Sequence, residues 1–153
     1  MHKKCIYTFF PFFFLIPYII ITDKNGFVKV FLQRSVKMAD FSCIFCKIIA
    51  GNIPSSKVYE DEKVFAFRDI NPQAPVHVLV VPKAHIESAD AIDASTSCEV
   101  AAVFEAIPRV AAACGLTNGY RVITNVGEDG CQSVKHIHFH VLGGTKLPEN
   151  MGI

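Results

Sequence analysis

The chain has 153 residues, of which 51% are hydrophobic and 19% charged, and its formal net charge is +1. This length suffices for one core, and this composition is typical of a globular protein, which excludes a disordered polypeptide. Residues 1–37 carry six Lys/Arg and one acid, whereas residues 38–153 carry nine Lys/Arg and thirteen acids. Because the larger part is mildly acidic and lacks a basic stripe, we expect no nucleic-acid binding through phosphate contacts.

The six cysteines do not form the pattern of a disulfide framework. Only Cys43 and Cys46 lie close together, while Cys98 and Cys114 fall in a helical pattern and Cys131 lies in a glycine-containing loop. A domain with this much apolar residue needs no disulfide cross-links. We therefore expect reduced thiols and a cytoplasmic or nuclear location.

Residues 1–37 differ from the rest of the chain. A short basic start precedes an apolar run at residues 9–21, which two prolines interrupt. The run is shorter than the roughly 20 residues of a membrane span, and no small-residue cleavage site follows it. Three interpretations stay open: a dispensable or mis-assigned extension with translation beginning at Met38, a targeting or anchoring segment, or ordered structure. Membrane contact is expected only if the segment is an anchor, and residues 38–153 are expected to form the domain.

The start of the domain predicts a short helix and then a hairpin. Ser42 is placed to cap a helix over Phe41–Ala50, and Gly51 to end it. The apolar residues of this helix fall at helical spacing, namely Phe41, Ile44, Phe45, Ile48 and Ile49. Two strand-like runs, Val58–Glu60 and Val64–Arg68, flank a polar turn at residues 61–63, which predicts a hairpin.

A buried strand and a long helix follow. Val76–Val81 is almost entirely apolar, follows the loop Asn71–Pro75 and ends at Pro82, so we expect a strand buried on both faces. Thr96-Ser97-Cys98-Glu99 is a capping-box pattern, and Gly115 suits the helix end. The expected apolar stripe consists of Val100, Val103, Phe104, Ile107, Val110, Ala111 and Cys114. Pro108 should kink or split this helix.

The last predicted strand holds three histidines. A strand at Arg121–Thr124 comes first, and then His136, His138 and His140 alternate with apolar residues. The two-residue period of a strand places the histidines on one face and the apolar residues on the other. Three imidazoles are poor core material, so this face should line a cleft or bind a ligand, although a solvated strand is the plain alternative. Consecutive strands with one inserted helix predict an α+β fold with a mainly antiparallel sheet.

A histidine flanked in this way suits nucleophilic catalysis. Neutral imidazole is a competent nucleophile near neutral pH. Its attack on phosphorus gives a phosphoramidate, which water then resolves, so that one difficult step becomes two easier ones. His138 has a histidine two residues away on either side, and such neighbours can donate to phosphate oxygens and fix the tautomer of the central ring.

The run from Gln132 through the three histidines to Gly143-Gly144 resembles the histidine triad (HIT) superfamily. With Asp69-Ile70-Asn71-Pro72-Gln73-Ala74-Pro75 upstream, it is similar to the nucleotide-binding HINT branch. The resemblance covers residues 39–144 approximately. It implies a HIT-like α+β fold, with a mainly antiparallel sheet, one long helix and a short N-terminal helix, and it implies a homodimer.

The resemblance also implies an activity, the hydrolysis of purine nucleoside 5′-phosphoramidates in which AMP or GMP is joined to an amine. His138 would take the nucleotidyl group, and no catalytic metal would be required. The implied catalytic residues are His138, His140, His77 and Ser133. The implied nucleotide-binding residues are Asp69, Ile70, Asn125, Gln132, Ser133, His138 and His140. The Gly127–Gly130 turn could also present backbone N–H groups to an anion.

Several of these residues have a structural interpretation as well. By resemblance, Asp69 would accept the two ribose hydroxyls and Ile70 would line the base pocket, but Asp69 could merely complete a turn before Asn-Pro. Asn125 would contact the phosphate, or it could satisfy a strand end. His77 lies between two valines and, taken alone, would be a core histidine. Gln132 and Ser133 would lie near the bridging atom of the scissile bond.

A metal site competes for the histidines. Two thiolates and two imidazoles suit tetrahedral Zn²⁺, and some HIT proteins bind zinc through a Cys-x-x-Cys and two histidines. By this resemblance, Cys43, Cys46, His85 and His136 are the ligands of a possible structural zinc. Cys43 and Cys46 could instead be two core thiols one helical turn apart.

Two departures from the HINT pattern bear on activity. Gly130-Cys131 stands where the pattern has Gly-Gly, and a positive φ at Cys131 would cost on the order of 1 kcal/mol and could shift Ser133. The C-terminal tail from Thr145 to Ile153 has no Trp, which leaves the preference for the leaving group open. Three rival functions remain: a dinucleoside polyphosphate hydrolase, a nucleotide-binding regulatory or scaffold protein, and a metal-dependent hydrolase that uses all three triad histidines as ligands.

Overall fold

The computed structural model describes residues 18–22, 28–32, 40 and 42–150. The chain divides into two units, Met1–Ser35 and Val36–Ile153. In the first, β1 (Tyr18–Thr22) pairs with β2 (Val28–Leu32) in an antiparallel hairpin. The predictions for the remainder of residues 1–37, for Phe41 and for the last three residues lie outside the described part. No helix in the described part is both long enough and apolar enough to cross a membrane.

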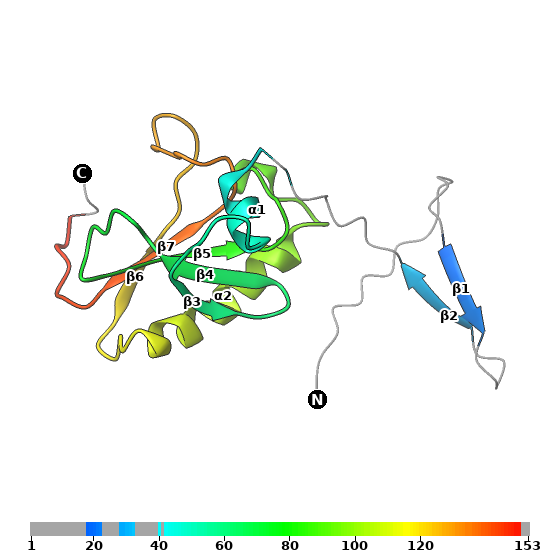
Figure 1. Cartoon of the computed structure of the whole chain (residues 1–153), viewed down its shortest axis with the longest axis horizontal. Helices are drawn as coiled ribbons and strands as arrows, with labels where there is room; N and C mark the ends of the chain where they lie inside the picture. The colour runs from blue at the N-terminus through cyan, green and yellow to red at the C-terminus, as the bar shows by residue number, and fades with distance from the viewer. Residues whose placement is uncertain (1–17, 23–27, 33–39, 41, 151–153) are drawn as a thin grey trace. The chain divides into compact units, whose positions relative to one another are not determined.

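The second unit is built on a five-stranded antiparallel sheet with the order β3-β4-β5-β7-β6 (Figure 1). The strands are β3 (Lys57–Glu60), β4 (Val64–Arg68), β5 (Val76–Pro82), β6 (Tyr120–Ile123) and β7 (Phe139–Gly143). Every pairing in this sheet is antiparallel. The predicted α+β class with a mainly antiparallel sheet is therefore confirmed.

The two faces of the sheet are covered by different helices. Alternate residues of β4 and β5, such as Val64 and Val78, pack in a core with α2 (Ser97–Ala113). The residues between them, such as Phe65 and Leu79, pack in a second core with α1 (Ile44–Ile49). The central strands are thus buried on both faces, as the apolar run in β5 predicted. A short 3₁₀ helix, η1 (Ala89–Ala91), precedes α2.

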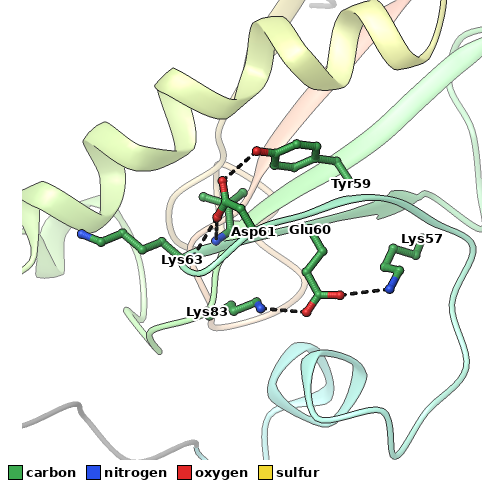
Figure 2. Close-up of polar contacts among 7 residues, drawn as sticks. Lys57, Tyr59, Glu60, Asp61, Lys63 and Lys83 are labelled. Carbon is green, nitrogen blue, oxygen red and sulfur yellow. Dashed lines mark hydrogen bonds and ion pairs between the residues drawn. The ribbon is translucent and has the colours of Figure 1, made fainter. Parts of the chain in front are cut away.

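The β3–β4 hairpin is fixed by the acidic residues at its turn (Figure 2). The Asp61 carboxylate accepts hydrogen bonds from the backbone N–H groups of Lys63 and Val64, both at 2.8 Å, and from the Tyr59 hydroxyl at 2.8 Å. Glu60 pairs with Lys57 at 3.0 Å and with Lys83 at 2.7 Å. These contacts hold the edge of the sheet beside the residues that follow β5.

The predicted helix N-caps are correct only in part. Cys43 is the N-cap residue of α1, because the Ser42 hydroxyl instead donates to the Asp40 carboxylate at 2.7 Å. Thr96 is the N-cap residue of α2, but its side chain makes no cap hydrogen bond, so the capping box does not form. The carboxylate of Asp93 instead accepts from the Ser95 hydroxyl and from the backbone N–H groups of residues 95 and 96, and these hydrogen bonds lower the pKa of Asp93 to about 2. Hydrogen bonding to the charged form of a carboxyl has this effect.

The predicted apolar stripes are correct in part. Helix α2 runs through Pro108 as one element, so the proline does not split it. Phe104 is 53% exposed, although its ring packs edge to face on Phe139 with a centroid distance of 5.2 Å. Ala106, which the predicted stripe did not include, is buried. In α1, Ile44 is likewise exposed. The two predicted C-terminal glycines, Gly51 and Gly115, do adopt positive φ.

Candidate active site and metal-binding cluster

Two neighbouring strands bring His77 and His140 together. His140 on β7 lies opposite Leu79 on β5, and His77 lies two residues before Leu79. Residues in this diagonal relation lie on the same face of an antiparallel sheet and within reach of one another when their side chains are long. Nε2 of His77 lies 2.8 Å from Nδ1 of His140. The sequence separation of these histidines is 63 residues, so only the sheet register joins them.

The hydrogen bonds of this pair define its tautomers. The backbone N–H of Gln73 donates to Nδ1 of His77 at 3.1 Å, so Nδ1 carries the lone pair and Nε2 carries the proton in the neutral ring. Nε2–H of His77 then donates to Nδ1 of His140, which leaves the proton of His140 on Nε2. The pair therefore presents an N–H donor at Nε2 of His140.

Asp69 adjoins this pair and also completes a turn. One of its carboxylate oxygens accepts from the backbone N–H of Asn71 at 2.8 Å, which is the turn interpretation of this residue. The other oxygen lies 3.4 Å from Nε2 of His77. The side chain of the next residue, Ile70, is fully exposed. The turn thus places a carboxylate beside the histidines and an apolar side chain in solvent next to it.

His138 is held from both sides. Its ring Nδ1–H donates to the backbone carbonyl of His136 at 2.7 Å, and its own carbonyl accepts from the Thr124 hydroxyl at 2.9 Å. Because Nδ1 carries the proton, the neutral ring has its lone pair at Nε2. The ring packs edge to face against the rings of Phe45 and His140, with centroid distances of 5.3 Å and 5.0 Å.

Burial keeps several of these rings neutral. Burial, together with the neighbouring His138 and His77, lowers the pKa of His140 to about 4. Burial also lowers the pKa of His77, although the Asp69 carboxylate opposes this shift. Desolvation disfavours the charged form of an imidazole, and a nearby histidine adds like-charge repulsion once protonated. Both rings are therefore uncharged near neutral pH.

The loop of residues 125–133 is built from its own polar groups. The Asn125 amide donates to the Gly130 carbonyl, and the Gln132 amide donates to the Glu87 carbonyl at 2.7 Å. Among the described residues, Cys131 is the only non-glycine with a positive φ, at 57°. The strain expected at this position is thus present. Ser133 is exposed beside it. In this structure the two amides serve to hold the loop.

The remaining candidate residues form a compact cluster. The cluster consists of Cys43, Cys46, His85 and His136, whose potential ligand atoms all lie within 4.8 Å of one another. Nδ1 of His136 lies 3.5 Å from Sγ of Cys43 and 3.6 Å from Sγ of Cys46. Nδ1 of His85 lies 3.4 Å from Sγ of Cys46. Zn–S bonds of about 2.3 Å and Zn–N bonds of about 2.0 Å at tetrahedral angles place S and N about 3.5 Å apart.

The chemistry of this donor set also fits a metal. Nε2–H of His136 donates to the Pro82 carbonyl at 2.9 Å, which leaves the lone pair on Nδ1, the atom that faces the thiols. An N–H to carbonyl bond of this kind is usual for a metal-binding histidine. Burial lowers the pKa of His136 to about 4 and raises the pKa of Cys46 to about 11. A bound cation would offset the cost of burying the thiolates.

The three triad histidines do not converge on one point. Among the described residues, ligand atoms gather in two groups, one with His136 and the two cysteines and the other with Asp69, His77 and His140. The second group is occupied by its own hydrogen bonds, because Nε2 of His77 must keep its proton while Nδ1 accepts from Gln73. This arrangement disfavours the hydrolase in which His136, His138 and His140 bind one metal.

Comparisons with known proteins identify the family of the chain. A family model described as HIT domain matches residues 50–147. The chain belongs to the HIT family. The 14 kDa zinc-binding protein of Zea mays is 48% identical over 113 residues, which is 72% of this chain and 88% of that protein.

Solved HIT structures match the same part of the chain. The HIT family hydrolase from Legionella pneumophila is 43% identical with a TM-score of 0.69, and the match covers 72% of this chain and 99% of that one. The histidine triad nucleotide-binding protein from Candida albicans is 34% identical with a TM-score of 0.59, over 70% of this chain and 84% of that one. The predicted HIT-like fold is therefore confirmed.

Sequence reasoning missed four groups that this HIT domain places around the histidines. They are the Gln73 N–H, the Pro82 carbonyl, the Thr124 hydroxyl and the Phe45 ring. Two of them are backbone groups, for which the sequence carries no signal. Thr124, at the end of a predicted strand, and Phe45, between the two cysteines, were visible but had no partner until the fold was known.

Proposed function

We propose that this HIT protein hydrolyses purine nucleoside 5′-phosphoramidates through a nucleotidyl group carried on His138. The 2.7 Å hydrogen bond from Nδ1 of His138 to the His136 carbonyl is the observation that carries this proposal. It fixes the tautomer in which Nε2 has a lone pair, and Nε2 is then the nucleophile. A nucleophile held by an orienting partner is the usual arrangement in covalent catalysis.

The proposed reaction has two balanced steps. In the first, Nε2 of His138 bonds to phosphorus, the P–N bond to the amine breaks, and the departing nitrogen takes a proton from water. In the second, water attacks phosphorus, the bond between phosphorus and Nε2 of His138 breaks, the hydroxyl stays on the nucleotide, and the remaining proton of that water passes to solvent. Nε2–H of His140, held by the hydrogen bond from His77, donates to a phosphate oxygen in both steps and keeps its proton. A donor placed beside the developing negative charge stabilises the transition state.

The proposed nucleotide site adjoins His77 and His140. Asp69 would accept the two ribose hydroxyls, and the exposed Ile70 would pack against the purine. Ser133 would contact the atom that bridges phosphorus and the leaving group. For Asn125 and Gln132, whose amides hold the loop in this structure, a contact with the phosphate requires a change of partner. The name of the Candida relative, a nucleotide-binding protein, supports a nucleotide ligand.

We further propose a structural zinc ion at Cys43, Cys46, His85 and His136, with no metal in the reaction itself. The name of the maize relative and the tetrahedral S–N spacing support this site. The chain is proposed to act as a homodimer in the cytoplasm. The five described cysteines are free of disulfides, which agrees with a reducing compartment.

A substrate comparison tests the activity. Adenosine 5′-phosphoramidate and a diadenosine polyphosphate are each incubated with the wild-type protein and with His138→Ala, and AMP release is measured. The proposal expects kcat/KM for the phosphoramidate to exceed that for the polyphosphate by at least about tenfold, a difference of about 1.4 kcal/mol. Preference for the polyphosphate would identify the rival hydrolase. Binding of AMP without turnover of either substrate would favour the regulatory protein.

A further inference from the structure

The proposed metal-binding cluster and the proposed nucleophile meet in one residue, His136. The side chain of His136 belongs to the cluster, with Nδ1 facing both cysteines and Nε2–H bonded to the Pro82 carbonyl. Its backbone carbonyl accepts the Nδ1–H of His138 at 2.7 Å. His136 is completely buried. One buried residue thus carries both a ring of the cluster and the acceptor that fixes the tautomer of His138.

Phe45 provides a second link between the same two sites. It lies between Cys43 and Cys46 in the sequence, at the start of α1. Its ring packs edge to face against His136 at 6.0 Å and against His138 at 5.3 Å. Phe45 is buried, and its ring also meets Phe67 at 5.5 Å. The position of α1, which the two cysteines would fix to the metal, thus determines the packing of the nucleophile's ring.

We propose that the cluster of Cys43, Cys46, His85 and His136 positions the nucleophile, so that zinc binding there holds His138 in the tautomer with Nε2 unprotonated. His136 and Phe45 are the positioning residues, through the carbonyl and the ring that contact His138. This inference rests on the proposed function for its catalytic consequence, although its structural part stands independently. Partners of metal-binding histidines typically change affinity or activity by about 10- to 100-fold when altered.

The test compares zinc-loaded protein, protein stripped by a chelator, and the Cys43→Ser/Cys46→Ser double variant. Cys98→Ser is the matched control, because Cys98 lies on α2 outside the cluster. The first readout is the ¹⁵N chemical shift of the two ring nitrogens of His138 at one fixed neutral pH, which reports the tautomer without substrate. The second is the rate of nucleotidyl transfer to His138 at saturating adenosine 5′-phosphoramidate. Zinc content and circular dichroism are recorded on each sample.

Loss of zinc is expected to bring the two ring nitrogens of His138 toward a mixture of tautomers. It should also slow nucleotidyl transfer by about tenfold or more, with the Kd for AMP changed much less. Restoring Zn²⁺ to the stripped protein should reverse both effects. A folded zinc-free protein with an unchanged tautomer and transfer rate would overturn the inference, and so would failure of the wild-type protein to bind Zn²⁺.

A second variant keeps the inference testable if the zinc-free protein unfolds. Phe45→Leu retains all four ligands and should keep its zinc, yet it removes the ring that contacts His138. The inference expects the same change in ring ¹⁵N shifts and a slower transfer rate, whereas Phe45→Tyr should restore both. Wild-type shifts and rate in zinc-loaded Phe45→Leu would overturn the inference. A tautomer that depends on zinc, in a protein that forms no nucleotidyl adduct, would leave the positioning intact and refute the proposed function.

Discussion

Five of the six histidines of this chain lie in two adjoining clusters that use imidazole in opposite ways. His85 and His136 face two thiols, and their Nδ1 atoms lie at spacings that suit a tetrahedral metal. The others, His77, His138 and His140, lie together, with the Asp69 carboxylate beside His77, and Nε2–H of His77 donates to His140. The histidines of both clusters are buried or half-buried, so burial alone does not decide what each ring can do.

The hydrogen-bond partner of one ring nitrogen decides what the other nitrogen of the same imidazole can do. In His136 the carbonyl of Pro82 takes the Nε2 proton, which frees Nδ1 for the cluster. In His138 the carbonyl of His136 takes the Nδ1 proton, which frees Nε2 for attack. Two histidines only two residues apart thus present opposite nitrogens, because different backbone carbonyls lie beside them. The role of a histidine follows from which of its nitrogens is already bonded.

Removal of the proposed nucleophile should have the largest effect, a loss of turnover without a loss of zinc. His138→Ala should lower the turnover of adenosine 5′-phosphoramidate by at least about 10³-fold, because no other ring in the catalytic cluster has an Nε2 lone pair. Its zinc content should change little, and its circular dichroism should show that it is folded. Lys135→Ala is the control, since Lys135 lies in the same segment but its side chain is 82% exposed. Turnover of His138→Ala within tenfold of the wild-type value would exclude a nucleophilic His138.

Loss of a cluster thiol should have the next largest effect, and on stability first. We expect purified protein to contain about one equivalent of zinc and Cys46→Ser to lose it, with a fall in Tm of several degrees. Cys46 lies on α1 and is buried in the second core, so Cys46→Ser would leave an unpartnered polar group there. Metal analysis and differential scanning calorimetry measure both quantities. Cys98→Ser should retain its zinc; equal zinc content in the two variants would contradict the cluster.

Acid should weaken the folded state through the same rings. Since the pKa of His140 is lowered from 6.5 to about 4, the unfolded chain binds more protons than the folded chain between these values. The free energy of unfolding should therefore fall as the pH decreases from about 6.5 to about 4, and no such loss from this residue should occur above about pH 6.5. After allowance for solvent screening, His140→Gln should reduce the loss by on the order of 1 kcal/mol. Urea unfolding across this range measures it, and an equal loss in both proteins would contradict the assignment.

The smallest expected effect concerns the loop beside Ser133. Cys131→Gly should raise the free energy of unfolding by about 1 kcal/mol or less, since glycine relieves the positive φ but adds freedom to the unfolded chain. Cys131→Ala keeps the Cβ and removes only the thiol, so it should not stabilise. Thermal unfolding distinguishes the two variants. A stabilising Cys131→Ala would show that the thiol, and not the backbone, is the source of the strain.

Much of the fold could be predicted from local patterns. The hairpin, the buried β5 and the long helix each follow from periodicity and turn residues, which act over a few positions. The helix caps could not, because Ser42 and Thr96 had competing partners in Asp40 and Asp93. Phe104 satisfies the helical period but contacts Phe139 from an exposed position, which depends on how α2 lies on the sheet.

The candidate site was predictable as a set of residues and not as a set of contacts. The family resemblance assigned His77 to the same site as the triad. Its hydrogen bond to His140, however, depends on the register between β5 and β7. The prediction that the three triad histidines alternate along one strand is wrong in part. Strand β7 begins only at Phe139, so His140 lies in it and His136 and His138 precede it. What each ring does depends on backbone groups that no sequence pattern encodes.

One measurement tests most directly whether His138 carries the nucleotidyl group while His136 belongs to the metal-binding cluster. Wild-type protein is mixed briefly with adenosine 5′-phosphoramidate and quenched, with and without chelator, and the adduct is located by peptide mass spectrometry. The account predicts one adenylyl group, on His138, and none on His136 or His140, at early times in the protein that retains its zinc. An adduct on either of the other two histidines, or turnover with no adduct, would contradict it.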